Sequence, residues 1–223
     1  MCSGSVAALK DLPLWEALKK LDMFNIEFVY TKPAQHFSYL LPAIANPDDS
    51  RPKEDWPKVW LDSDEWKWSK IGDPVIHIEL RKWADMYLIA PLSCNTMAKI
   101  ANGMCDNLLT CVIRACDMNS VIEVDDMILQ CTRILKKPII VCPAMNTMMY
   151  DNVFTYMHYK TMKDLGIIIV DCISKNLACG DVGKGAMENV PKIVKKVKYI
   201  AEEYLLQDFE AKMQEAAEEE AKQ

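Results

Sequence analysis

The chain lacks the features that mark nucleic-acid-binding and membrane proteins. Its 223 residues carry a formal net charge of −6, which argues against nucleic-acid binding through a basic face. No apolar run approaches the roughly 20 residues of a membrane span, and no signal peptide is visible. The sequence therefore predicts neither a nucleic-acid partner nor a membrane partner.

Cysteine pairs with a recognisable spacing are also missing. The nine cysteines are scattered, without C-x-x-C pairs or the spacing of a zinc site, so no metal centre is predicted. Without a secretory signal, they are expected to be reduced thiols of a cytoplasmic protein, most of them packed as small core residues. At 51% hydrophobic residues, the chain can bury one sizeable core.

Short apolar runs, each typical of a buried strand, alternate with helical patterns along the chain. The runs are residues 26–30, 86–90, 138–142 and 167–171, and the helices are expected at 7–21, 152–165 and 190–223. The alternation predicts a doubly wound α/β fold, flavodoxin-like or Rossmann-like, with a parallel sheet covered by helices on both faces. We expect one domain over residues 1–200 and a charged helical tail over 201–223.

A polar loop follows the run at 86–90, at the carboxyl end where open α/β sheets bind ligands. Ser93, Cys94, Asn95 and Thr96 occupy it, and Asn95 or Thr96 could cap a helix that begins near Met97. Such a helix start suits a phosphate or an electron-rich ring edge. A plain capped loop would show the same residues.

The remaining segments give weaker expectations. Residues 43–60 predict an exposed proline-rich loop, 60–62 a short strand, and Asp73-Pro74 the cap of the helix with His77. Residues 118–135, with apolar positions at Val121, Val124, Ile128 and Ile134, predict an amphipathic helix. Residues 174–188 contain three glycines and predict a mobile loop.

Several long sequence motifs resemble those of one enzyme family. The motifs are SGSVAALK (3–10), HIELRKWAD (77–85), APLSCNT (90–96), CDNLLTCVIRACD (105–117), PAMNTMM (143–149) and LACGDVGKGAM (177–187). They closely resemble the homo-oligomeric flavin-containing cysteine decarboxylases, on the branch that acts on 4′-phosphopantothenoylcysteine. The resemblance runs from residue 3 to about residue 200.

The resemblance implies an FMN-dependent lyase of coenzyme A synthesis. In that family the substrate cysteine is oxidised by the flavin to a thioaldehyde, carbon dioxide leaves, and the hydride returns to give 4′-phosphopantetheine. It also implies a homotrimer whose active site spans a subunit interface. Two alternatives share the flavin core: an inhibitory subunit of a serine/threonine protein phosphatase, and a peptidyl-cysteine decarboxylase.

Three catalytic residues follow from the resemblance. His77 would draw a proton or orient the substrate, Asn146 would bind the departing carboxylate, and Cys179 would reprotonate the product from a lid. In the family the histidine comes from one chain and the other two from its neighbour. A lone histidine is more often structural, and an asparagine after a strand is often only a helix cap.

Ligand-contacting residues also follow from the resemblance. The lid residues expected to touch substrate, besides Asn146, are Asn176, Ala178 and Met187; Asn176 stands where a basic residue is usual. Cys94 stands where alanine is usual, and Phe37 could equally be ordinary core packing. The expected FMN contacts are Gly4, Ser5, Val6, Thr31, Phe37, Ser93, Cys94, Asn95, Thr96 and Ala144.

The start of the chain departs from the family pattern. Relatives place an apolar strand before the SGSV motif, whereas here only Met1 and Cys2 precede Ser3, and a strand needs about five residues. Either the sequence is truncated or a sheet element is lost. The strands at 26–30 and 86–90 would then face each other with unpaired backbone groups, and restoring about six apolar residues should raise the melting temperature and the flavin content.

Overall fold

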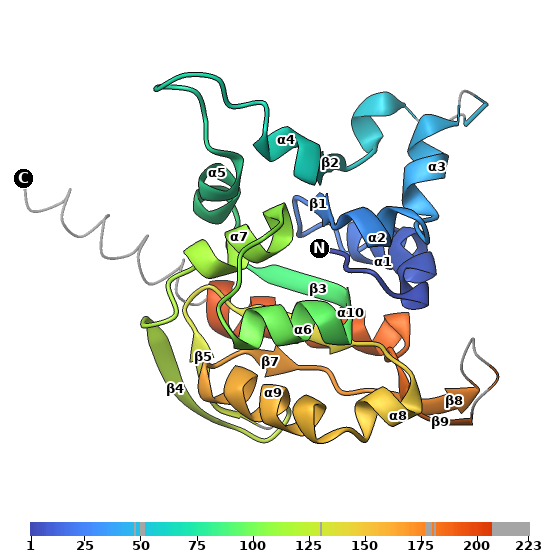
Figure 1. Cartoon of the computed structure of the whole chain (residues 1–223), viewed down its shortest axis with the longest axis vertical. Helices are drawn as coiled ribbons and strands as arrows, with labels where there is room; N and C mark the ends of the chain where they lie inside the picture. Colours follow the sequence, from blue (N-terminus) through green and yellow to red (C-terminus); the bar gives the residue numbers. More distant parts are fainter. Residues whose placement is uncertain (47, 50–51, 130, 177–179, 181, 207–223) are drawn as a thin grey trace, which may run out of the picture.

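A parallel sheet with helices on both faces forms the centre of the computed structural model, which describes residues 1–46, 48–49, 52–129, 131–176, 180 and 182–206 (Figure 1). Its strands are β1 (Glu27–Tyr30), β2 (Lys58–Leu61), β3 (Tyr87–Leu92), β6 (Ile139–Pro143) and β7 (Ile168–Ile169). β1 pairs with β2, and β6 pairs with both β3 and β7, all in parallel. The four predicted strands are confirmed, and the short strand expected at 60–62 is β2.

The first three residues join the two parts of this sheet. The Cys2 N–H donates to a carbonyl of β1 at 2.8 Å, and the Cys2 carbonyl accepts from the Thr31 N–H at 3.1 Å. On the other side, the Met1 carbonyl accepts from Ala90 of β3 at 3.0 Å, and the Ser3 N–H donates to the next β3 residue at 3.1 Å. The expectation that this position is empty is therefore wrong, because a three-residue segment fills it and pairs with both neighbours.

The resulting strand order is β2, β1, residues 1–3, β3, β6, β7. Counted along the chain, this is the 3-2-1-4-5-6 order of doubly wound folds that bind nucleotides. Successive strands run outward in opposite directions from the boundary between residues 1–3 and β3. That boundary is the topological switch point, where such sheets bind ligands at their carboxyl ends.

Helices cover both faces of the sheet. α6 (Cys94–Ala101) and α9 (Val153–Asp164) lie side by side in front of it in Figure 1, and α10 (Val190–Ile200) lies behind. α10 buries Ile193, Val197 and Ile200, which recur at the spacing of one helix face, so its lysines stay on the outer side. α1 (Asp11–Lys19) packs beside α10, and α7 (Leu108–Ala115) packs against α5 (Ile76–Trp83).

Short elements make the connections. The helix predicted at 7–21 is divided into a 3-10 turn, η1 (Val6–Lys10), and α1, while the helix expected from 190 is described as α10 followed by a π-helical turn, Ala201–Leu206. The predicted loop at 43–60 contains the end of a helix, a short turn and most of β2. No helix in the described part of the chain is long and apolar enough to cross a membrane. The other short helices are α2 (Lys32–Gln35), α3 (Leu40–Ala45), η2 (Lys53–Asp55), α4 (Asp62–Glu65) and α8 (Thr147–Tyr150).

Residues 118–135 form an antiparallel hairpin, so the predicted amphipathic helix is wrong. The hairpin pairs β4 (Val121–Asp126) with β5 (Cys131–Leu135). The segment is rich in β-branched residues, which favour strands, and the Asp126 carboxylate accepts the Leu129 N–H at 2.8 Å to close the turn. Ile134 is buried, whereas Ile128, which the helical pattern placed on the apolar face, is 59% exposed.

A second hairpin lies where a mobile loop was predicted. β8 (Ile173–Asn176) pairs antiparallel with β9 (Val182–Ala186), and Asn176 lies opposite Val182. The prediction for 174–188 is therefore wrong for most of its length. Residues 177–179 and 181 lie outside the described residues.

Candidate active site

Four neighbouring segments of the sheet end at the same edge, and the predicted flavin-contacting residues follow them. Gly4, Ser5 and Val6 follow residues 1–3, Thr31 follows β1, the loop 93–96 follows β3, and Ala144 follows β6. Because these segments are parallel, their carboxyl ends lie together at the switch point. The structure thus brings together residues from four distant parts of the chain.

A buried serine locks the two loops at the switch point together. The Ser3 hydroxyl donates to the Pro91 carbonyl at 3.0 Å and accepts the Ser93 N–H at 2.6 Å. Ser3 has no exposed surface. Sequence reasoning missed this residue, because a serine beside a glycine turn gives no sign that its hydroxyl bonds to a segment ninety residues away.

The first loop is shaped by close backbone approach. A Cβ added to Gly4 would lie 2.5 Å from the Cβ of Pro33, so any larger residue would push the loop away from the start of α2. Ser5 caps η1 by accepting the Ala7 N–H at 3.3 Å, and Val6 is exposed. Beside this loop, the buried Thr31 hydroxyl has no hydrogen-bond partner among the described residues. A buried polar group without a partner is costly, so this hydroxyl can bond a ligand that lies beside it.

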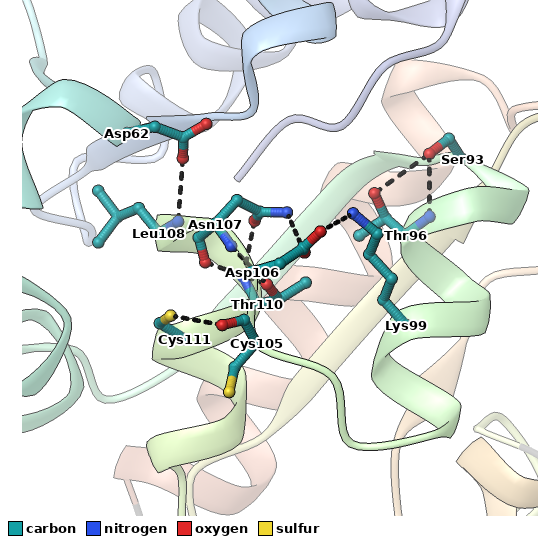
Figure 2. Close-up of polar contacts among 10 residues, drawn as sticks. All are labelled: Asp62, Ser93, Thr96, Lys99, Cys105, Asp106, Asn107, Leu108, Thr110 and Cys111. Atoms are coloured by element: carbon teal, nitrogen blue, oxygen red, sulfur yellow. Dashed lines mark hydrogen bonds and ion pairs between the residues drawn. The ribbon is translucent and has the colours of Figure 1, made fainter.

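The start of α6 differs by a few residues from its prediction. α6 begins at Cys94, and its cap is Ser93, whose hydroxyl accepts the Thr96 N–H at 3.3 Å (Figure 2). Asn95 and Thr96 are therefore first-turn residues rather than caps; Asn95 is exposed and Thr96 is buried. The first amide groups of α6 have no intrahelical partner, so they suit an anion such as the FMN phosphate.

These observations together fit FMN. The α6 amino terminus suits a phosphate, the Thr31 hydroxyl is free to bond a ribityl hydroxyl or a ring atom, and Gly4 leaves room beside them. Phe37 is half-buried after α2, and Ala144 is buried, with its N–H donating to a β3 carbonyl at 2.9 Å. No metal-binding cluster of His, Cys, Asp or Glu was found within the described ranges.

His77 lies in the first turn of α5 and is held by a carboxylate that the sequence did not point to. Its Nδ1 lies 2.5 Å from Glu65 Oε1, and its backbone N–H donates to Glu65 Oε2 at 3.0 Å. The predicted cap, Asp73, instead accepts from the backbone and hydroxyl of Ser69, so that prediction is wrong. The His77 side chain is 26% exposed.

Asn146 follows β6 and caps α8, where its side-chain oxygen accepts the Met148 N–H at 2.8 Å. β9 lies directly against this turn, because the Met145 N–H donates to the Gly185 carbonyl at 2.9 Å. A Cβ added to Gly183 would lie 2.6 Å from the Thr147 hydroxyl oxygen, so the close approach requires glycine. The structure therefore brings Asn146 and the β8–β9 hairpin together.

An ion pair fixes the base of that hairpin. Lys184 Nζ lies 2.6 Å from an Asp171 carboxylate oxygen, which also accepts from the Tyr150 hydroxyl at 3.0 Å. Burial alone would raise the pKa of Asp171, but the hydrogen bonds from Lys184, the Cys172 N–H and Tyr150 outweigh it and hold that pKa below its ordinary value. Asp171 thus links Lys184 of β9 to Tyr150, the last residue of α8.

The lid residues themselves are only partly described. Asn176 is exposed at the end of β8, and Met187 is buried after β9, where its carbonyl accepts from Lys10 Nζ at 3.2 Å. Ala178 and Cys179 lie outside the described residues. Met187 therefore packs into the core in this chain.

The structure does not gather all the predicted catalytic residues in one chain. α5, which carries His77, and α8, which follows Asn146, lie on opposite sides of the molecule in Figure 1. The predicted catalytic residues thus fall into two separate half-sites, Asn146 with the hairpin and His77 with Glu65.

The comparisons with known proteins agree with this geometry. The family model described as Flavoprotein matches residues 1–201. The phosphopantothenoylcysteine decarboxylase of Mus musculus is 42% identical over 205 residues, which cover 91% of this chain and 85% of the mouse protein.

Two solved structures are also similar. One is a cysteine-to-serine variant of PPC decarboxylase complexed with pantothenoylaminoethenethiol, with a TM-score of 0.74, 42% identity and coverage of 90% of this chain and 95% of that one. The other is the FMN binding protein AtHal3, with a TM-score of 0.71, 44% identity and coverage of 90% and 94%.

Proposed function

From the fact that the chain belongs to the Flavoprotein family, we infer that it catalyses the FMN-dependent decarboxylation of 4′-phosphopantothenoylcysteine to 4′-phosphopantetheine, a step of coenzyme A biosynthesis. The observation that carries this inference is the cradle at the switch point. There the unpartnered Thr31 hydroxyl, the Gly4 turn and the α6 amino terminus lie at one sheet edge. When bound, FMN supplies a hydride acceptor that also returns the hydride.

The residue roles are proposals that rest on chemistry and position. Asn146 offers an amide that can hold the substrate carboxylate without adding charge, at the turn against which the hairpin packs. His77 presents a partly exposed imidazole that can accept the proton of the substrate thiol. Cys179 would return a proton to the decarboxylated product, because a thiol can exchange protons.

We propose that the active site forms between two chains of a homotrimer. Large apolar side chains are exposed beside each half-site, and exposed apolar patches mark interaction sites. Near Asn146 they are Met148, Met149, Val153, Phe154, Tyr156 and Met157, the α8–α9 apolar face. Near His77 they are Trp66, Trp68 and Ile71, the α4–α5 apolar loop.

Contact between these two unlike surfaces would be head to tail, and such contacts close into rings when the rotation allows. Each contact would place His77 of one chain beside Asn146 of the next. The two faces thus support both the oligomer and the shared site.

The test uses the purified full chain. We expect a yellow protein with about one FMN per chain that releases carbon dioxide from 4′-phosphopantothenoylcysteine. The His77→Asn variant should keep the flavin and lose the release. A wild-type protein that holds FMN but releases no carbon dioxide would contradict the enzyme and favour the phosphatase-regulating alternative. That alternative, the peptidyl-cysteine substrate and the cytoplasmic location stay predictions.

A further inference from the structure

The acidic turn before the α4–α5 apolar loop contains three carboxylates with three separate tasks. Asp62 Oδ1 accepts the Leu108 N–H, the first amide of α7, at 2.9 Å (Figure 2). Asp64 Oδ2 accepts the Leu61 N–H at 2.7 Å and closes its own turn. Glu65 alone among them reaches the catalytic candidate His77.

Glu65 holds both the backbone and the ring of His77. Oε2 accepts the His77 N–H at 3.0 Å, one of the first amide groups of α5, which have no partner within the helix. Oε1 lies 2.5 Å from Nδ1. The Glu65 side chain is 16% exposed and that of His77 26%, so little water competes for these contacts. Two contacts from one carboxylate fix the position and the rotation of the imidazole.

The contact also determines which ring nitrogen carries the hydrogen. A carboxylate only accepts hydrogen bonds, so the nitrogen that faces it must be a donor. In the neutral imidazole this places the hydrogen on Nδ1 and leaves Nε2 as an acceptor. Nε2 is the nitrogen remote from Glu65, and therefore the one available to a substrate.

We propose that Glu65 is a positioning residue for catalysis: it holds the His77 imidazole in the Nδ1–H form, with Nε2 free to accept the substrate proton. The proposal rests on the role proposed for His77. When Nε2 accepts the thiol proton, the ring becomes an imidazolium that is stabilised by the adjacent carboxylate. The thiol is left as a thiolate, and no other bond changes in this step.

A plain helix cap would make the same backbone contact, so the variants must separate the two roles. In Glu65→Gln, the amide oxygen can still accept the His77 N–H, which is an obligatory donor. The amide NH₂ then faces Nδ1, which must become an acceptor, and the hydrogen moves to Nε2. Glu65→Asp keeps the carboxylate, and Asp64→Asn is the matched control in the same turn.

The experiment measures the tautomer directly by ¹⁵N NMR of histidine-labelled protein. The chain has only three histidines, and His77→Asn assigns the signal of interest. We expect Nδ1–H in the wild type, in Glu65→Asp and in Asp64→Asn, and Nε2–H in Glu65→Gln. With 4′-phosphopantothenoylcysteine, kcat of Glu65→Gln should fall on the order of 10²-fold, with FMN content and KM retained.

The outcomes separate this proposal from the proposed function. An Nε2–H tautomer in the wild type would overturn the positioning role whatever the activity, as would an unchanged tautomer and kcat in Glu65→Gln. If Glu65→Gln does not fold, Glu65→Ala, which removes the carboxylate, decides: loss of the Nδ1–H form supports the proposal and its retention overturns it. The expected tautomers in a protein without decarboxylase activity would support the geometry and refute the function.

Discussion

The unpartnered hydroxyl of Thr31 provides a test of the flavin cradle in which two measurements move in opposite directions. Thr31 is 5% exposed, and its hydroxyl oxygen bonds to nothing in the described part of the chain. In Thr31→Val a methyl group replaces the hydroxyl with nearly the same shape. The apo protein then no longer buries an unsatisfied polar group, so its unfolding free energy should rise.

The size of the effect follows from the cost of an unsatisfied group. That cost is about 1–3 kcal/mol, so we expect apo Thr31→Val to gain about 2 kcal/mol, or a few degrees in melting temperature. With FMN bound, the wild-type hydroxyl is satisfied and the variant has nothing to offer the flavin. The same 2 kcal/mol is then lost from binding, which weakens the Kd for FMN about 30-fold.

The assay combines thermal unfolding of the apo protein with a flavin-fluorescence titration. Thr110→Val is the matched control, because the Thr110 hydroxyl accepts the Asn107 N–H at 3.2 Å and donates to the Asn107 carbonyl at 3.0 Å. The Thr110→Val variant should have a lower unfolding free energy in the apo form and an unchanged Kd for FMN. A Thr31→Val protein with lower apo stability and the wild-type Kd would refute the cradle.

Three further predictions concern β9, the ion pair of Asp171, and Cys179. Gly183→Ala places a Cβ against Thr147, so both the melting temperature and the decarboxylation rate should fall, while Val182→Ala, at an exposed position on the same strand, should change stability little. The Lys184 ammonium and the other hydrogen-bond donors hold the pKa of Asp171 below its ordinary value, so the ion pair stabilises at neutral pH and is lost as the pH falls through that lowered pKa. Asp171→Asn should therefore cost under about 1 kcal/mol at pH 7, since both groups are exposed, and less at pH 3 by thermal unfolding. The Cys179→Ser variant should keep FMN and still decarboxylate the substrate. Because a hydroxyl is a weaker acid than a thiol, mass spectrometry should show that an oxidised, decarboxylated product accumulates. Full turnover at the wild-type rate would exclude this thiol as the proton donor.

The strands were predictable because each is a short apolar run, and the turn residues after them follow from the rule for open α/β sheets. The cofactor and the substrate were predicted only from the resemblance of the long motifs to the decarboxylase family. The hairpin at 118–135 was not predictable from spacing, since Val121, Val124 and Ile128 satisfy a helical period as well as they fit strands. Its β-branched residues were the signal that could have decided the question.

Tertiary contacts explain the remaining misses. Glu65 accepts the His77 N–H from a position twelve residues earlier in the chain, whereas local capping rules pointed to Asp73. Residues 1–3 were expected to be too few for a strand, yet the Cys2 backbone bonds to the β1 side while the Met1 and Ser3 backbones bond to β3. No pattern within the sequence distinguishes such contacts from ordinary surface polarity.

The most direct test of the central claim is the decarboxylation rate of mixed assemblies of two inactive variants. His77→Asn and Asn146→Asp should each be inactive alone, because each lacks one half of every site. When equal amounts of the two variants co-assemble in a ring, a site is intact only where an Asn146→Asp chain supplies His77 to a His77→Asn neighbour. Each of these two conditions holds for about half of the sites, so about a quarter of the wild-type activity should return. Verified mixed assemblies without any carbon dioxide release would contradict a site shared between chains.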